Sequence, residues 1–90
     1  MVKHFNITIR GKVQGVWYRA SAQAEAQQLG LAGFARNMPD GSVYCEAEGE
    51  ENRLQEFVKW CHHGPQLARV ETVDVEEGAV QGFADFGIRR

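Results

Sequence analysis

The sequence has no long apolar segment. None of its apolar runs approaches the roughly 20 residues that a membrane helix needs. The residues that follow Met1 also lack the apolar core of an export signal, because they run directly into an alternating apolar and polar pattern. We therefore expect a cytoplasmic protein without contact with a membrane.

Cysteine is scarce. The two cysteines, Cys45 and Cys61, each stand within an apolar pattern, which fits reduced core thiols better than a disulfide framework, although the pattern leaves open whether the two could pair. The run Cys61-His62-His63 contains three potential metal ligands, but adjacent residues of a helix point in different directions and cannot converge on one ion. The sequence predicts no metal site.

An excess of charge is also missing. Ten Lys and Arg against twelve Asp and Glu leave a formal net charge of -2, which supplies no general attraction toward nucleic acid or an anionic membrane. Any anion must therefore be bound by a local cluster of donors. A chain of 90 residues suffices for one core and is too short for two, so we expect residues 1–90 to form one domain, by default a monomer.

Periodicity predicts an alternating series of strands and helices. Strict alternation of apolar and polar residues predicts strands that bury one face, and apolar residues at spacings of three and four predict amphipathic helices. A glycine or a Gly-Pro pair ends each helical pattern. The predicted elements are strands over 5–9, 33–38 and 43–48, helices over 19–29 and 50–63, and strands near 70–75 and 86–88.

The order of these elements indicates a fold class. It reads strand, helix, strand, strand, helix, strand, with a short extra strand at the end, which is typical of the ferredoxin-like split arrangement. We predict an α+β fold, a ferredoxin-like α/β sandwich whose antiparallel sheet carries both helices on one face. The alternation between Val70 and Val73 shifts by one residue, which predicts a β-bulge.

The segment 11–19 joins the first strand to the first helix and suits an anion. Gly15 allows the backbone to turn so that successive N–H groups converge, and the free N–H groups and dipole of a helix start add positive character. Arg19 could then grip a phosphate with two hydrogen bonds. The segment is neither a Walker A loop nor a dinucleotide fingerprint. The spacing alone fits equally well a plain strand-to-helix connection in which Arg19 is solvated. An arginine at a helix start opposes the helix dipole, however, and this favours a nearby anion.

Asn37 is the second candidate. Strands 5–9 and 33–38 are joined through a helix, so they run parallel and their carboxyl ends share one edge of the sheet. With strand 43–48 between them, the two ends lie roughly 10 Å apart, a gap that fits a phosphate and one water between Arg19 and Asn37. Taken alone, Asn37 is more simply a residue that caps the following turn.

At these positions the sequence resembles the acylphosphatase family. The family pattern of a glycine, one residue, Val-Gln-Gly-Val, one residue, an aromatic and Arg is met over residues 11–19. The run Gly-Phe-Ala-Arg-Asn at 33–37, followed by Asp-Gly-Ser-Val at 40–43, is similar to a second family signature. Further similarities lie at Gly64-Pro65, at 68–70 and at 86–88, so the resemblance spans essentially the whole chain.

The resemblance implies an enzyme and its site. It implies hydrolysis of the carboxyl–phosphate anhydride of a small-molecule acyl phosphate to a carboxylate and inorganic phosphate, without metal, cofactor or phosphoenzyme. The family's catalytic arginine matches Arg19 and its catalytic asparagine, which orients the water, matches Asn37. Trp17 stands at a variable position, where it could shape which acyl groups fit. The resemblance implies a phosphate-binding loop of Gln14, Gly15, Val16, Trp17, Tyr18 and Arg19.

Other polar residues are interpreted as surface groups. His4 precedes a strand and has no evident acid or nucleophile as a partner, so we expect a solvated edge residue. We interpret Glu46, Glu48, Glu50 and Glu51 as a solvated face and as negative charge at a helix start, not as an acid–base pair.

Two other functional classes stay open. The ferredoxin-like architecture also hosts RNA-recognition domains, but residues 41–48 are acidic where a phosphate backbone would lie and lack the usual aromatic motif, so we expect no nucleic acid. A sensing domain, or a carbamoyl-phosphate-handling domain cut from a larger protein, is the third class, and the free-standing length of the chain argues against it.

Overall fold

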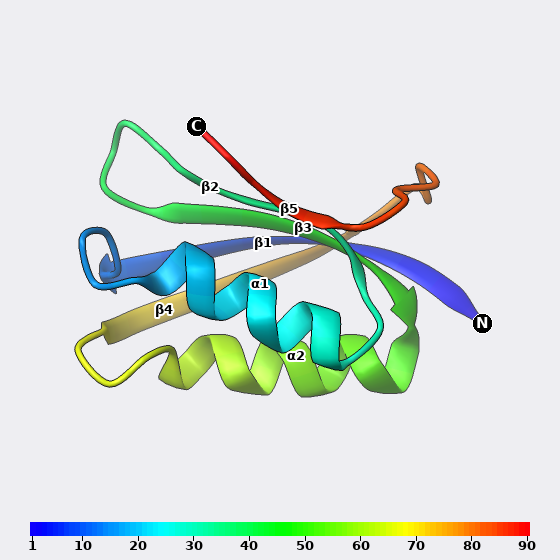
Figure 1. Ribbon diagram of the computed structural model, residues 1–90, viewed down its shortest axis with the longest axis horizontal. Helices are drawn as coiled ribbons and strands as arrows, with labels where there is room; N and C mark the ends of the chain where they lie inside the picture. The colour runs from blue at the N-terminus through cyan, green and yellow to red at the C-terminus, as the bar shows by residue number, and fades with distance from the viewer.

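Five strands form one sheet, and two helices lie on the same side of it (Figure 1). The computed structural model describes all of residues 1–90. No helix has the length and apolar character needed to cross a membrane. The elements in chain order are β1 (Val2–Lys12), α1 (Tyr18–Gln28), β2 (Ala32–Asn37), β3 (Val43–Glu50), α2 (Glu51–His63), β4 (Arg69–Gly78) and β5 (Phe86–Arg89).

The order of strands in the sheet is β4-β1-β3-β2-β5. β1 pairs antiparallel with β3 and β4, and β2 pairs antiparallel with β3. The predicted fold class is thus confirmed, with one addition: β5 pairs parallel with β2, so the sheet is mixed and not wholly antiparallel. The reason is geometric, because β4 runs opposite to β2 and the chain reverses once more before β5.

The predicted bulge is present between β1 and β4. Arg10 faces Thr72 and Gly11 faces Val70, so Glu71 is the extra residue. Gly11 has φ +130°, and a Cβ there would lie 2.1 Å from the carbonyl oxygen of Arg69. This position therefore requires glycine, both for its φ and for the close approach of the two backbones.

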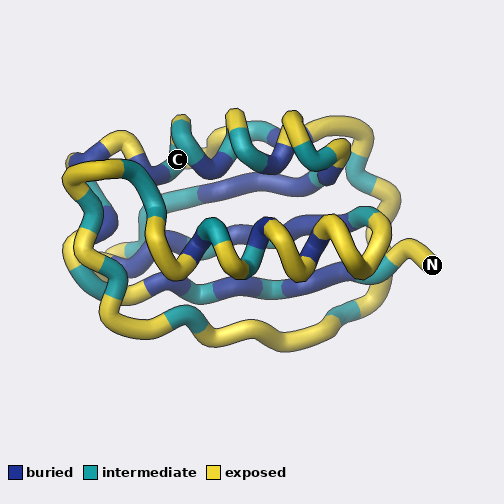
Figure 2. Tube along the Cα trace, turned by 90° about the horizontal axis from the view of Figure 1, so that it is seen from below, coloured by how far each residue is buried: buried dark blue, intermediate teal, exposed yellow.

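The core lies between the sheet and the helices. Figure 2 shows the buried residues on the central strands and on the inner faces of both helices, whereas β4 is mainly exposed. The predicted apolar faces of the helices and the central strands are buried, whereas that of β4 is not. In α1 the buried residues Ala22 and Ala26 are small, which lets the helix approach the sheet closely. The fully buried side chains of the strands and α2 include Ile7, Ile9, Val43, Cys45, Leu54, Phe57 and Cys61.

Cys45 and Cys61 are buried, free thiols, as predicted. Burial raises the pKa of Cys61 to about 12 and raises the pKa of Cys45 well above its usual value. Both thiols therefore stay protonated at neutral pH and are poor nucleophiles.

The prediction that His4 is solvated was wrong. Its side chain is only 1% exposed, and its Nδ1 lies 2.7 Å from Oε2 of Glu48. Its Nε2 lies 2.9 Å from Oδ1 of Asn6 and 3.0 Å from Oε1 of Glu46. The partners come from pairing of β1 with β3, which sets His4 opposite Glu48, and this register is not visible in the local sequence.

Glu48 was also wrongly assigned to a solvated face. It is 5% exposed, and its carboxylate accepts hydrogen bonds from the backbone N–H groups of Gln81, Gly82 and Phe83. Burial acts to raise the pKa of Glu48, but these donors and His4 outweigh it, so the pKa lies below its usual value. Glu48 thereby ties the chain between β4 and β5 to the sheet.

Candidate active site

The loop between β1 and α1, residues 13–17, turns sharply before the helix begins. Gly15 has φ +74°, and Trp17, the residue that precedes α1, has φ +67°. The first helical hydrogen bond runs from the N–H of Ser21 to the carbonyl of Trp17, so the N–H groups before Ser21 have no partner within the helix. No side chain caps this end and no acidic residue lies in the first turn. The helix start is therefore ready to bind an anion.

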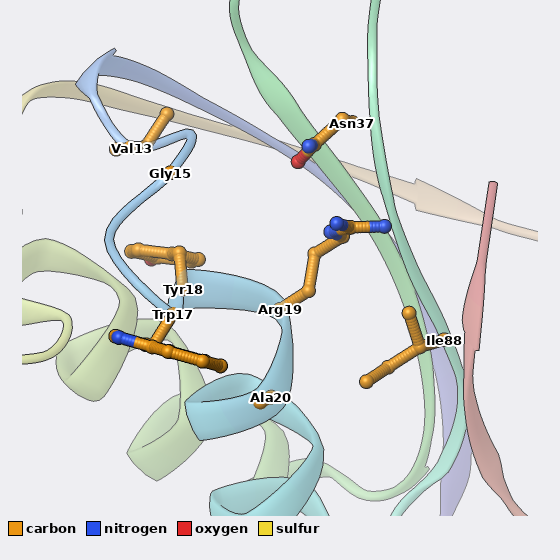
Figure 3. Close-up of a pocket in the computed structure, with 8 residues that line it drawn as sticks. All are labelled: Val13, Gly15, Trp17, Tyr18, Arg19, Ala20, Asn37 and Ile88. Carbon is orange, nitrogen blue, oxygen red and sulfur yellow. The ribbon is translucent and has the colours of Figure 1, made fainter.

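Arg19 lies in the first turn of α1 and carries an unneutralised charge. It forms no ion pair with a carboxylate, and its Nη1 lies 3.4 Å from the carbonyl oxygen of Arg89 in β5. A half-buried guanidinium at the positive end of a helix gains stability from an anion placed between them. Figure 3 shows Arg19 extending from α1 toward Asn37.

Asn37 ends β2, and β3 lies between β1 and β2 as predicted. Its Oδ1 is buried and has no hydrogen-bond partner. The following turn is instead stabilised by Asp40, whose Oδ1 accepts hydrogen bonds from the N–H (3.0 Å) and hydroxyl (2.6 Å) of Ser42. These bonds lower the pKa of Asp40. The amide of Asn37 is therefore not used by the turn, and a buried amide oxygen calls for a donor.

Gln14 joins the loop before α1 to the turn after β2. Its Nε2 donates to the carbonyl oxygens of Met38 (2.8 Å) and Ser42 (2.9 Å). Gln14 was predicted only as a residue of the loop, without this contact to the turn. No local signal could have revealed it, because both acceptors lie more than twenty residues further along the chain.

Tyr18 is an anchor of the helix start and not a free hydroxyl. Its ring is buried, lies 5.3 Å from that of Trp60, and its hydroxyl donates to the carbonyl oxygen of Cys61 at 2.7 Å. Burial, with the neighbouring thiols, raises the pKa of Tyr18 far above its usual value. The hydroxyl thus stays protonated and holds the start of α1 against α2.

One pocket, of about 350 Å³, opens between α1, β2 and β5 (Figure 3). It brings together Arg19 and Asn37, which lie on different elements. Of the other residues expected at the site, Gln14 and Val16 do not line it: Gln14 bonds to the turn, and Val16 is buried in the core. Val13, Ala20 and Ile88 line the pocket but were not predicted as site residues. The lining residues are Val13, Gly15, Trp17, Tyr18, Arg19, Ala20, Asn37 and Ile88.

The donor set of the pocket fits an anion. Arg19 is the one charged residue that lines it, and the neighbouring backbone N–H groups and amide are neutral. No group of three or more His, Cys, Asp or Glu side chains in the protein is arranged to hold a metal ion. The site can therefore bind a phosphate-like group through hydrogen bonds and one full positive charge.

Comparison with known proteins shows the family of the chain. The family model for acylphosphatase matches residues 5–88. An acylphosphatase of Methylococcus capsulatus is 48% identical over 90 residues, with 99% of this chain and 98% of that protein covered. The chain belongs to the acylphosphatase family.

Other acylphosphatases extend the match. One from a Nocardioides species is 50% identical over 84 residues, which cover 93% of this chain and 85% of that protein. The crystal structure of acylphosphatase from Bacillus subtilis is similar to this chain with a TM-score of 0.96 and 37% identity, with 100% of both chains covered. The predicted family and the predicted ferredoxin-like fold are confirmed.

Proposed function

We propose that this member of the acylphosphatase family hydrolyses acyl phosphates to a carboxylate and inorganic phosphate. The observation that carries the proposal is the pocket, which is lined by an unpaired guanidinium, by an asparagine with an unpartnered amide oxygen and by a helix start with free N–H groups. Family membership supports the reaction type. That residues 1–90 act as one acylphosphatase-like domain is part of the proposal.

The phosphoryl group binds where positive charge and backbone donors converge. In this proposal, the N–H groups of residues 14–18 and the guanidinium of Arg19 donate hydrogen bonds to its oxygens. These donors are held by α1 and by the loop before any substrate arrives, so little reorganisation is needed as charge develops on the phosphoryl oxygens. The absence of a competing carboxylate on Arg19 leaves its full charge for the substrate.

Asn37 orients the water. Its Oδ1 accepts a hydrogen bond from the water, which attacks phosphorus in line with the bond to the acyl oxygen. A new P–O bond forms, the anhydride P–O bond breaks, and its electron pair leaves with the carboxylate. We assign the water's proton to a phosphoryl oxygen of the substrate, because no carboxylate or histidine lines the pocket. An essential enzyme base that appeared in the pH–rate profile and vanished with one side chain would contradict this assignment.

Steady-state hydrolysis of benzoyl phosphate tests the proposal. Chelator-treated protein is compared with Arg19→Ala and Asn37→Ala, and with Arg53→Ala and Asn52→Ala as matched controls on the exposed start of α2. We expect kcat/KM to fall on the order of 10²- to 10³-fold in each site variant and to stay near wild type in the controls. Circular dichroism checks that each variant is folded.

The possible outcomes separate the alternatives. Activity that survived either site substitution would mean that the site is placed wrongly. A folded wild type without turnover would instead favour a phosphate-binding or RNA-binding module.

The remaining expectations on partners stay predictions. We propose a small-molecule substrate, no nucleic acid or membrane as partner, a monomer, and a cytoplasmic location. Sedimentation at several protein concentrations tests the monomer. A shift to a higher mass with concentration would contradict it.

A further inference from the structure

The pocket has one polar and one apolar end. Its volume of about 350 Å³ falls in the range of about 300–1,000 Å³ that small-molecule sites occupy, so it is suited to more than a phosphate group. Arg19 and Asn37 mark the polar end. Figure 3 shows Trp17 and Ala20 on the side of Arg19 away from Asn37, with Ile88 of β5 across from Trp17.

Trp17 is held in a costly conformation and exposed. Its side chain is 77% exposed, and it is the only residue other than glycine with positive φ. This conformation is unfavourable for a bulky residue and would suit glycine or asparagine better. Trp60, in contrast, packs against the rings of Tyr18 and Phe57. The fold thus gains little from the indole of Trp17, whereas a ligand in the pocket would bury it.

The proposed hydrolysis assigns the acyl group to the apolar end. In an in-line displacement the leaving group lies opposite the attacking water. Asn37 holds the water at the polar end, so the acyl group extends toward Trp17 and Ala20. Ile88, 42% exposed in the edge strand β5, borders the same space.

We propose that Trp17 and Ile88 bind the acyl group, and that the enzyme prefers acyl phosphates whose acyl group is flat and apolar, such as an aroyl or arylacetyl group. The proposal rests on the proposed function. A flat ring can stack on the indole and bury both apolar surfaces. A carboxylate on the acyl group would find no further cation in the lining, because Arg19, which binds the phosphate, is the one charged residue there.

Selectivity between two substrates tests this assignment. The ratio of kcat/KM for benzoyl phosphate to that for acetyl phosphate is measured in wild type, Trp17→Asn and Trp17→Phe. Asparagine tolerates positive φ but offers no ring, so we expect the ratio to fall about tenfold in Trp17→Asn and to be largely restored in Trp17→Phe. Val80→Asn, which changes an exposed apolar residue outside the pocket, should leave the ratio at its wild-type value.

Inhibition gives a second readout that needs no variant. Benzylphosphonate and methylphosphonate carry a stable phosphonate with and without a ring. We expect the wild type to bind benzylphosphonate about tenfold more tightly, and equal inhibition constants would overturn the proposal.

The outcomes also separate this proposal from the proposed function. Turnover of both substrates with a ratio that Trp17→Asn leaves unchanged would overturn only the acyl-group assignment. A folded wild type that hydrolyses neither substrate would overturn both.

Discussion

Replacing Gln14 with alanine should slow catalysis by loosening the turn that follows Asn37. The substitution removes two hydrogen bonds, from Nε2 to the carbonyl oxygens of Met38 and Ser42. Both carbonyls keep another donor, since that of Met38 also accepts from the N–H of Gly41 and that of Ser42 from the N–H of Met38. No carbonyl is left unsatisfied, so the cost is the net value of two bonds, about 1–3 kcal/mol.

That free energy limits the effect on the rate. If all of it is lost from the transition state, kcat falls between roughly 5-fold and 150-fold, at about 1.4 kcal/mol for each factor of ten. We expect the loss mainly in kcat, because the proposed role of Asn37 is to orient the water and not to hold the phosphate. Steady-state kinetics with benzoyl phosphate measure kcat, and urea unfolding of the same samples measures the free energy of unfolding.

A matched glutamine separates stability from positioning. Gln23 in α1 also donates from Nε2 to a backbone carbonyl, that of Phe86 at 3.1 Å, but it does not line the pocket. Gln23→Ala should lower the free energy of unfolding with kcat near wild type. The reasoning is refuted if Gln14→Ala is destabilised to a similar degree while its kcat stays within about twofold of wild type.

Two further predictions concern buried polar groups away from the pocket. The folded-state pKa of Glu48 lies below its ordinary value of 4.5, so its ionised form adds stability at neutral pH that is lost as the pH falls through the folded-state pKa. In urea unfolding, the difference in free energy of unfolding between wild type and Glu48→Gln should therefore be smaller at pH 3 than at pH 7. An equal difference at both pH values would contradict this. Tyr18→Phe removes the donor to the buried carbonyl of Cys61 and should lower the free energy of unfolding by about 1–3 kcal/mol, measured by the same method. A change near zero would show that the carbonyl finds another donor.

The local sequence was sufficient for the elements and for part of the site. Alternation and helical spacing depend on neighbours within a few residues, so the strands, both helices and the bulge near Glu71 could be predicted. Gly15 and Arg19 were identifiable for the same reason, because a loop and the helix that follows it are continuous in the chain. The parallel direction of the strands that end near Arg19 and Asn37 followed from connectivity alone.

Contacts between distant segments were decided only by the tertiary structure. The burial of His4 and Glu48 depends on the register of β1 against β3 and on the chain that covers them, and neither leaves a periodic signal in the sequence. The bonds of Gln14 to the turn after β2 and the place of Ile88 in the lining of the pocket have the same origin. Hydrogen bonds and apolar contacts across such separations arise when the sheet assembles, so the shape of the apolar end of the pocket is a property of the fold and not of any one motif.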